Sequence, residues 1–180
     1  MRIFGVDPGS KCTGYGCIET NGSRHRVVVC GALTPPARAT FPEKLLAIHA
    51  ELSKLLTRHR PDSVAIEDLF YAKNARSALQ LGHVRGVLIL AASEAGLPVA
   101  EYSPTEVKRA VVGYGRAEKQ QVQEMVALLL GLDTTPLPFD VSDALAVAVC
   151  HSHSLGPARD DINKPARAAR SWRRYRPQAG

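Results

Sequence analysis

Long apolar runs and paired cysteine motifs are both missing from this 180-residue chain. No stretch approaches the roughly 20 apolar residues that a membrane-spanning helix needs, so we expect no membrane segment and no membrane partner. The first acidic side chain, Asp7, comes too early for a signal peptide, which favours a cytoplasmic protein. In that reducing compartment we expect free thiols at all four cysteines, Cys12, Cys17, Cys30 and Cys150.

The sequence also lacks an internal repeat and a GxxxxGK[ST] phosphate loop. Hydrophobic residues make up 45% of the chain and charged residues 22%, close to the values of ordinary globular domains. This composition excludes wholesale disorder, and the length excludes a miniprotein held together by disulfides. The chain therefore reads as a single folded domain with a core of its own.

Positive charge is concentrated at the C-terminal end of the chain. Residues 156–180 carry seven Lys or Arg and two Asp, whereas residues 1–155 carry 16 basic and 15 acidic groups. With three prolines and almost no large aliphatic side chains, residues 156–180 have little surface to bury. We expect a folded domain over 1–155 and a flexible basic tail over 156–180. Such a tail attracts polyanions, and the alternative is a solubilising end without a dedicated partner.

The order of predicted elements indicates an α/β domain. Three short strands joined by glycine-containing turns come first and favour an antiparallel meander. Helices and two further strands then alternate, which predicts a mixed sheet with helices on its faces. The expected strands are 3–6, 13–19, 25–33, 63–67 and 98–102, and the expected helices are 45–56, 75–95, one starting at the Ser103-Pro104 capping box, 117–130 and 141–150.

Two acidic residues stand at the carboxyl ends of predicted strands. Asp7 follows an apolar strand, and Glu67 ends a strand in which Val64 and Ile66 point to the opposite face. Ligands gather at such strand ends in α/β folds, although Asp7 could instead cap the turn that follows it. Asp68 shares the face of Val64 and is expected to be structural.

Asp140 and Asp143 are three residues apart at the start of a predicted helix and so lie on one helix face. Taken alone, they could simply favour the helix N-terminus. Two carboxylates about 5 Å apart at an effective dielectric near 20 repel by about 3 kcal/mol, so four acids in one cleft require cations. Mg²⁺ or Mn²⁺ suits all-oxygen ligation. A pair of such ions can activate the attacking water and stabilise the leaving oxygen in phosphodiester hydrolysis.

Several segments together carry a resemblance to a known family. They are Gly5-Val6-Asp7-Pro8-Gly9, the glycines at positions 14 and 16, the run EDLFYAKNARSALQLGHVRG over 67–86, and DVSDALA over 140–146. With these the chain resembles the RuvC family of Holliday junction resolvases over about residues 1–153. The resemblance implies a ribonuclease-H-like fold, with a mixed five-stranded sheet flanked by helices. It also implies a homodimer that nicks two opposing strands of a four-way DNA junction during recombination and repair.

The same resemblance assigns roles to individual residues. Position 140 is histidine in some members. The helix 78–92 suits the family's dimer interface, and a RuvAB-type branch-migration helicase complex is the implied partner. Lys108 and Lys119 fall near the scissile phosphate, although ordinary solvated helix charge is the alternative for both. The implied catalytic acids, which would hold two Mg²⁺ ions per site with Mn²⁺ as a substitute, are Asp7, Glu67, Asp140 and Asp143.

Three further residues are assigned to DNA contacts. Phe70 matches an aromatic that the family places against junction bases, where stacking is worth about 1–3 kcal/mol, and the alternative is a core side chain. Lys73 and Arg76 are candidates for phosphate contacts.

Other interpretations make different demands on the sequence. An actin-like or sugar-kinase fold also opens with an Asp-x-Gly turn, but it duplicates its core and 180 residues hold one copy only. A catalytically silent binder of branched nucleic acid would use the acids as caps. A soft-metal site at His151 and His153 is disfavoured, because residues two apart on a helix face different ways.

Overall fold

The computed structural model describes residues 1–22, 24–68, 74–132 and 137–155. Its five strands form one sheet in the order β3-β2-β1-β4-β5, with β1 antiparallel to β2 and parallel to β4. The predicted mixed five-stranded sheet is thereby confirmed. The elements are β1 (Arg2–Asp7), β2 (Thr13–Asn21), β3 (Arg24–Leu33), α1 (Phe41–His59), β4 (Ser63–Glu67), α2 (Ala75–Glu94), β5 (Val99–Tyr102), α3 (Pro104–Val112), α4 (Lys119–Leu130) and α5 (Phe139–Ser154).

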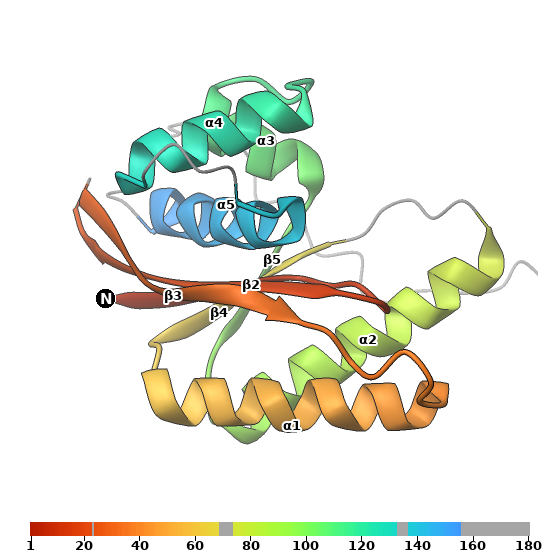
Figure 1. The fold of residues 1–180 in the computed structure, drawn as a ribbon. Coiled ribbons are helices and arrows are strands. Elements are labelled where there is room, and N and C mark those ends of the chain that lie inside the picture. Colours follow the sequence, from red (N-terminus) through yellow and green to blue (C-terminus); the bar gives the residue numbers. More distant parts are fainter. Residues whose placement is uncertain (23, 69–73, 133–136, 156–180) are drawn as a thin grey trace, which may run out of the picture.

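Helices cover both faces of the sheet, with α3, α4 and α5 on one side and α1 and α2 on the other (Figure 1). In β1, Ile3 packs with the cluster under α5, whereas Phe4 and Val6 pack with the cluster over α1 and α2. Since side chains alternate along a strand, Asp7 belongs to the α5 face. The same alternation in β4 puts Glu67 on that face.

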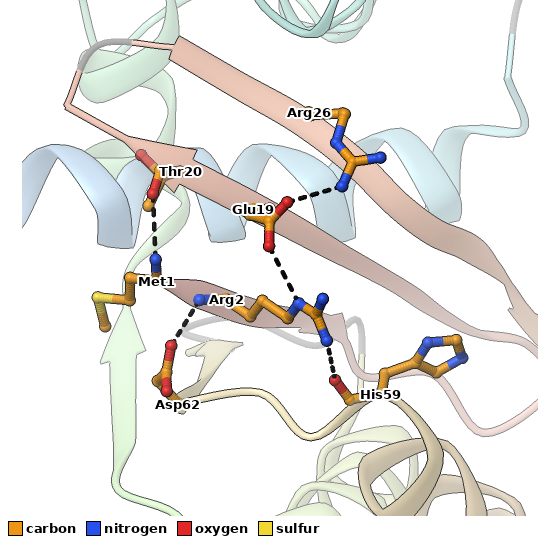
Figure 2. A network of polar contacts seen from close by, with 7 residues as sticks. All are labelled: Met1, Arg2, Glu19, Thr20, Arg26, His59 and Asp62. Atoms are coloured by element: carbon orange, nitrogen blue, oxygen red, sulfur yellow. Dashed lines mark hydrogen bonds and ion pairs between the residues drawn. The ribbon is translucent and has the colours of Figure 1, made fainter.

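Polar contacts at the beginning of β1 fix its register with both neighbouring strands (Figure 2). The backbone N–H of Arg2 donates to Asp62 Oδ2 at 2.6 Å, just before β4. Its guanidinium donates to Glu19 on β2 at 3.3 Å and to the His59 carbonyl at 3.1 Å. A shift by one residue would move every side chain of β1 to the other face, so these contacts help to hold Asp7 on the α5 face.

Glycines on β1 and β2 let the backbone of α5 approach the sheet closely. Gly5 and Gly16 are partners across the strand pair, as are Asp7 and Gly14. A Cβ atom at Gly5 would overlap the Ala144 carbonyl oxygen, and one at Gly14 would overlap the Asp140 carbonyl oxygen. The glycine spacing noted in the sequence thus places the first turn of α5 directly against the end of β1.

We expect Gly14→Ala to lower the free energy of unfolding by about 1–3 kcal/mol, because the added methyl meets helix backbone that cannot rotate away. Gly31→Ala on β3 is the matched control, since its Cβ would meet mainly the hydroxyl end of the Tyr15 side chain. Urea unfolding of both variants measures the difference. Equal stability of the two variants would contradict the close approach of α5.

Three predicted helices have wrong boundaries. Helix α1 runs from Phe41 to His59 rather than over 45–56, because the capping box at Thr40 starts it earlier. Helix α4 begins at Lys119 rather than at residue 117, because Glu118 is the N-cap and forms a capping box with Gln121. Helix α5 extends beyond 141–150 at both ends, since the Pro138 carbonyl accepts from Ser142 N and the helix stays buried as far as His151. The predicted capping box of α3 at Ser103 is confirmed.

The four cysteines are free, as predicted. None of the helices in the described ranges is long and apolar enough to cross a bilayer. Residues 156–180 lie outside the described residues, so the boundary between the domain and the basic tail stays a prediction.

Candidate active site

Two strand ends bring Asp7 and Glu67 together. Strands β1 and β4 are parallel with Val6 opposite Ile66, so the next residue of each strand is Asp7 and Glu67. A hydrogen bond between the two carboxyl groups favours the proton on Asp7. The register between β1 and β4 therefore brings these two acids together, as the sequence predicts.

Helix α5 adds its own acids to this pair. Burial, followed by the negative charges of Glu67, Asp143 and Asp140, raises the pKa of Asp7 to about 9. Burial also raises the pKa of Glu67 and of Asp143. Several ionised carboxylates close together in a site with little water repel one another strongly. A proton on Asp7, shared with Glu67, lowers this repulsion.

Two lysines approach the acids from α3 and α4. Lys119 Nζ lies 2.7 Å from Asp143 Oδ2, and this ion pair opposes the upward shift of the Asp143 pKa. The positive charge of Lys108 acts on both Glu67 and Asp143 in the same direction. Both lysines therefore lie beside the acid cluster, and their part in catalysis stays a prediction.

Asp68 does not join the acid cluster. Its backbone N–H donates to the Tyr102 carbonyl at 2.7 Å, and its carboxylate lies 3.4 Å from the guanidinium of Arg85 on α2. Arg85 also pairs with Glu101 on β5. Asp68 thus fastens the carboxyl end of β4 to its neighbours, which agrees with the predicted structural role. The sequence analysis missed Arg85, whose only signal was a charge inside an apolar helix.

Cys12 is a second residue that the sequence analysis missed at this site. It lies in the turn after β1, which Thr13 closes by donating from its hydroxyl to the Gly9 carbonyl at 2.8 Å. Burial, followed by a hydrogen bond with Asp140, raises the pKa of the Cys12 thiol to about 11. A thiol with this pKa is protonated at neutral pH.

Of the three residues assigned to DNA contacts, the structure describes Arg76 alone. Phe70 and Lys73 are outside the described residues. Arg76 is exposed in the first turn of α2. His151 is hydrogen-bonded to the Tyr102 hydroxyl at 2.7 Å and to Ser63 at 3.0 Å. That bonding occupies both ring nitrogens of His151, consistent with the rejection of a soft-metal site.

The acid cluster fits a hard divalent cation by its chemistry. Its donors are carboxylate oxygens, which Mg²⁺ and Mn²⁺ prefer. A bound cation would relieve the repulsion that, after burial, raises the pKa of Asp7. As the side chains stand, no three His, Cys, Asp or Glu residues of the described chain form a group that could hold an ion. Asp143 Oδ2 is paired with Lys119, so a bound ion and the ammonium would compete for this carboxylate.

Comparison with known proteins gives a consistent result. The family model described as crossover junction endodeoxyribonuclease RuvC matches residues 3–151. The chain is 51% identical over 155 residues to the protein of that name from Heliobacterium modesticaldum, covering 86% of this chain and 96% of the relative. It is 49% identical over 158 residues to the one from Ruminiclostridium cellulolyticum, covering 87% and 95%.

Solved structures agree with the fold. The structure of Thermus thermophilus RuvC in complex with a Holliday junction substrate superposes with a TM-score of 0.81 at 35% identity, covering 84% of this chain and 93% of that one. The yeast mitochondrial Holliday junction resolvase Ydc2 shares the fold, with a TM-score of 0.62 at 16% identity, covering 83% of this chain and 77% of that one. The ribonuclease-H-like fold expected from the sequence is confirmed.

Proposed function

Because the chain belongs to the RuvC family of crossover junction endodeoxyribonucleases, we propose that it resolves four-way DNA junctions by nicking two opposing strands in recombination and repair. The observation that carries this proposal is the meeting of Asp7 and Glu67, at the ends of β1 and β4, with Asp143 of α5. Two lysines lie beside these acids. These residues all lie within the part of the chain that matches the family.

The family's nucleases are metal-dependent, and we assign the ligands here to Asp7, Glu67, Asp140 and Asp143, with two Mg²⁺ per site and Mn²⁺ as a substitute. When bound, these ions supply Lewis acidity toward the phosphodiester and lower the pKa of water. The carboxylates determine where the ions bind, because β1, β4 and α5 hold these side chains in place. Lys108 and Lys119 contribute positive charge that attracts the scissile phosphate and stabilises charge developing on it.

Nicking of a synthetic four-way junction tests this function against its alternatives. Incubation with Mg²⁺ and without ATP should yield nicked strands, and EDTA should prevent them. A silent binder would shift the junction in a gel without cutting it. A phosphotransferase of the actin-like type would require ATP and leave the DNA intact.

Helix α2 carries the surface that we assign to a homodimer. Ala78, Gly82 and Gly86 recur every four residues on one face, and a Cβ at either glycine would meet nothing within 4 Å. Leu79 and Leu90 on the same face are 65% and 52% exposed. A second copy of α2 could approach this apolar face closely, because its small residues leave room for a partner helix. A two-fold dimer would present two acid clusters to the two opposing strands.

We assign residues 156–180 to nonspecific DNA attraction, and expect the domain over 1–155 to carry junction selectivity. Phe70 is assigned to a junction base, and Lys73 and Arg76 to phosphates. The helicase partner is proposed to be a RuvAB-type branch-migration complex, and the compartment to be the cytoplasm.

Deleting residues 156–180 should weaken binding of junction and plain duplex by similar factors. The reason is that seven basic side chains act on any phosphate backbone by counterion release. The slope of log K against log salt should flatten, while the ratio of junction to duplex affinity stays constant. Titrations of full-length and truncated protein at several salt concentrations measure both quantities. A collapse of that ratio on truncation would show that the tail reads junction structure.

A further inference from the structure

An exposed aromatic ring stands at the edge of the acid cluster. Phe139 is the first residue of α5 and precedes Asp140, and it remains 42% exposed. Lys119 Nζ lies over this ring, 5.1 Å from its centroid. The same nitrogen atom is 2.7 Å from Asp143 Oδ2. The Lys119 ammonium therefore has two interaction partners, the Asp143 carboxylate and the face of the Phe139 ring.

The two partners differ in whether a divalent cation competes with the ammonium for them. The face of an aromatic ring attracts an ammonium within about 6 Å of its centroid, and it is not a ligand for Mg²⁺. Asp143, in contrast, is a proposed ligand, and a cation at that carboxylate competes with Lys119 for it. Without the ring, a long and half-exposed lysine that lost Asp143 would be free to rotate into solvent.

We propose that Phe139 is a positioning residue that keeps the Lys119 ammonium at the acid cluster when Asp143 turns to a metal ion. The contact between Lys119 and the Phe139 ring is observed in the structure, and its consequence for cleavage rests on the proposed function. The ring holds the ammonium without neutralising it, so the charge stays available to a phosphate. A leucine at position 139 would keep an apolar contact of similar size and lose the attraction.

NMR of the lysine side chains in full-length protein tests the contact without any cleavage. A lysine carbon and its protons over a ring are shifted by ring current, and the Lys119 signal is identified by its loss in Lys119→Arg. We expect the shift in wild type, its loss in Phe139→Leu and its retention in Phe139→Trp. Addition of Mg²⁺ should leave the wild-type shift in place. Phe41→Leu is the control, since Phe41 is also the first residue of a helix but lies across the sheet beside His83.

Single-turnover nicking under saturating protein measures the consequence. Phe139→Leu should nick about two- to fivefold more slowly, which is the size of an exposed cation–π contact, with junction affinity unchanged. Phe139→Trp should restore the rate, and Phe41→Leu should nick as wild type does. A Lys119 signal that is the same in Phe139→Leu and wild type, or one that Mg²⁺ releases from the ring, would overturn the proposal. If wild type nicks no junction, the proposed function fails while the NMR result still decides the contact.

Discussion

Asp7→Asn is expected to reduce metal-dependent junction nicking by at least about a thousandfold. Loss of a central ligand removes several kcal/mol of charge stabilisation in the transition state, and each 1.36 kcal/mol is a factor of ten in rate. Binding of the junction should persist or tighten, because the substitution removes negative charge near the phosphate. Gel shifts in EDTA and nicking assays in Mg²⁺ separate the two effects.

The same variant should be more stable than wild type at neutral pH without metal. The folded-state pKa of Asp7 is raised to about 9 from an ordinary value of 3.8, so folding at pH 7 requires a proton that the unfolded chain does not bind. The free-energy cost of binding this proton is absent below pH 3.8, the pKa of Asp7 in the unfolded chain. It grows as pH rises toward about 9, the pKa of Asp7 in the folded protein. The stability gain of Asp7→Asn should therefore be large at pH 7 and vanish near pH 4. Each 1 kcal/mol corresponds to about 2–4 °C in Tm for a chain of this size.

Glu51→Gln is the matched control, since Glu51 is an exposed acid on α1, across the sheet from the cluster. It should nick normally and gain no stability. Adding Mg²⁺ should raise the Tm of wild type and of this control but not that of Asp7→Asn, because only an intact cluster binds the ion in the folded state. Undiminished Mg²⁺-dependent cleavage by Asp7→Asn would remove Asp7 from the site.

Leu79→Asp on α2 is expected to dissociate the proposed dimer into monomers at micromolar concentration. A charge at the centre of an apolar interface is buried without a partner when two copies meet. Nicking of the two opposing strands should then become uncoupled and slower, since one monomer presents one acid cluster. Analytical ultracentrifugation measures the mass, and a supercoiled cruciform plasmid shows whether the two nicks occur in one binding event.

Leu128→Asp controls for this change, because Leu128 on α4 is 76% exposed and lies on the other side of the sheet. It should remain dimeric and nick both strands together. A wild-type protein that is monomeric at these concentrations, or a Leu79→Asp variant that stays dimeric, would exclude the α2 face as the interface.

Much of the site follows from local sequence patterns. Alternation in β4 was enough to place Glu67 opposite Val64 and Ile66, and helix spacing was enough to pair Asp140 with Asp143. The spaced glycines were noted as part of a motif, but their physical role needed the structure. Only the register between β1 and β2 and the path of α5 show that Gly14 makes room for the Asp140 backbone.

Contacts between distant elements escaped the sequence analysis. Arg85 on α2 pairs with Asp68, which follows β4, and with Glu101 on β5, and nothing in its own helix signals these contacts. Phe139 meets Lys119 because the starts of α4 and α5 lie together, although the two residues are 20 positions apart. Propensity and periodicity describe single elements, so pairings of this kind emerge only when the elements are packed.

The proposed function requires the acid cluster to cut two strands of a branched DNA. Its most direct test is a four-way junction with each strand labelled in turn, incubated with the protein in Mg²⁺ beside a linear duplex of the same arm sequence. We predict nicks in two opposing strands at symmetric positions, none in the duplex, and none in either substrate with EDTA. Nicks that persist in EDTA, that fall equally on the duplex, or that are absent from a junction the protein visibly binds would contradict it.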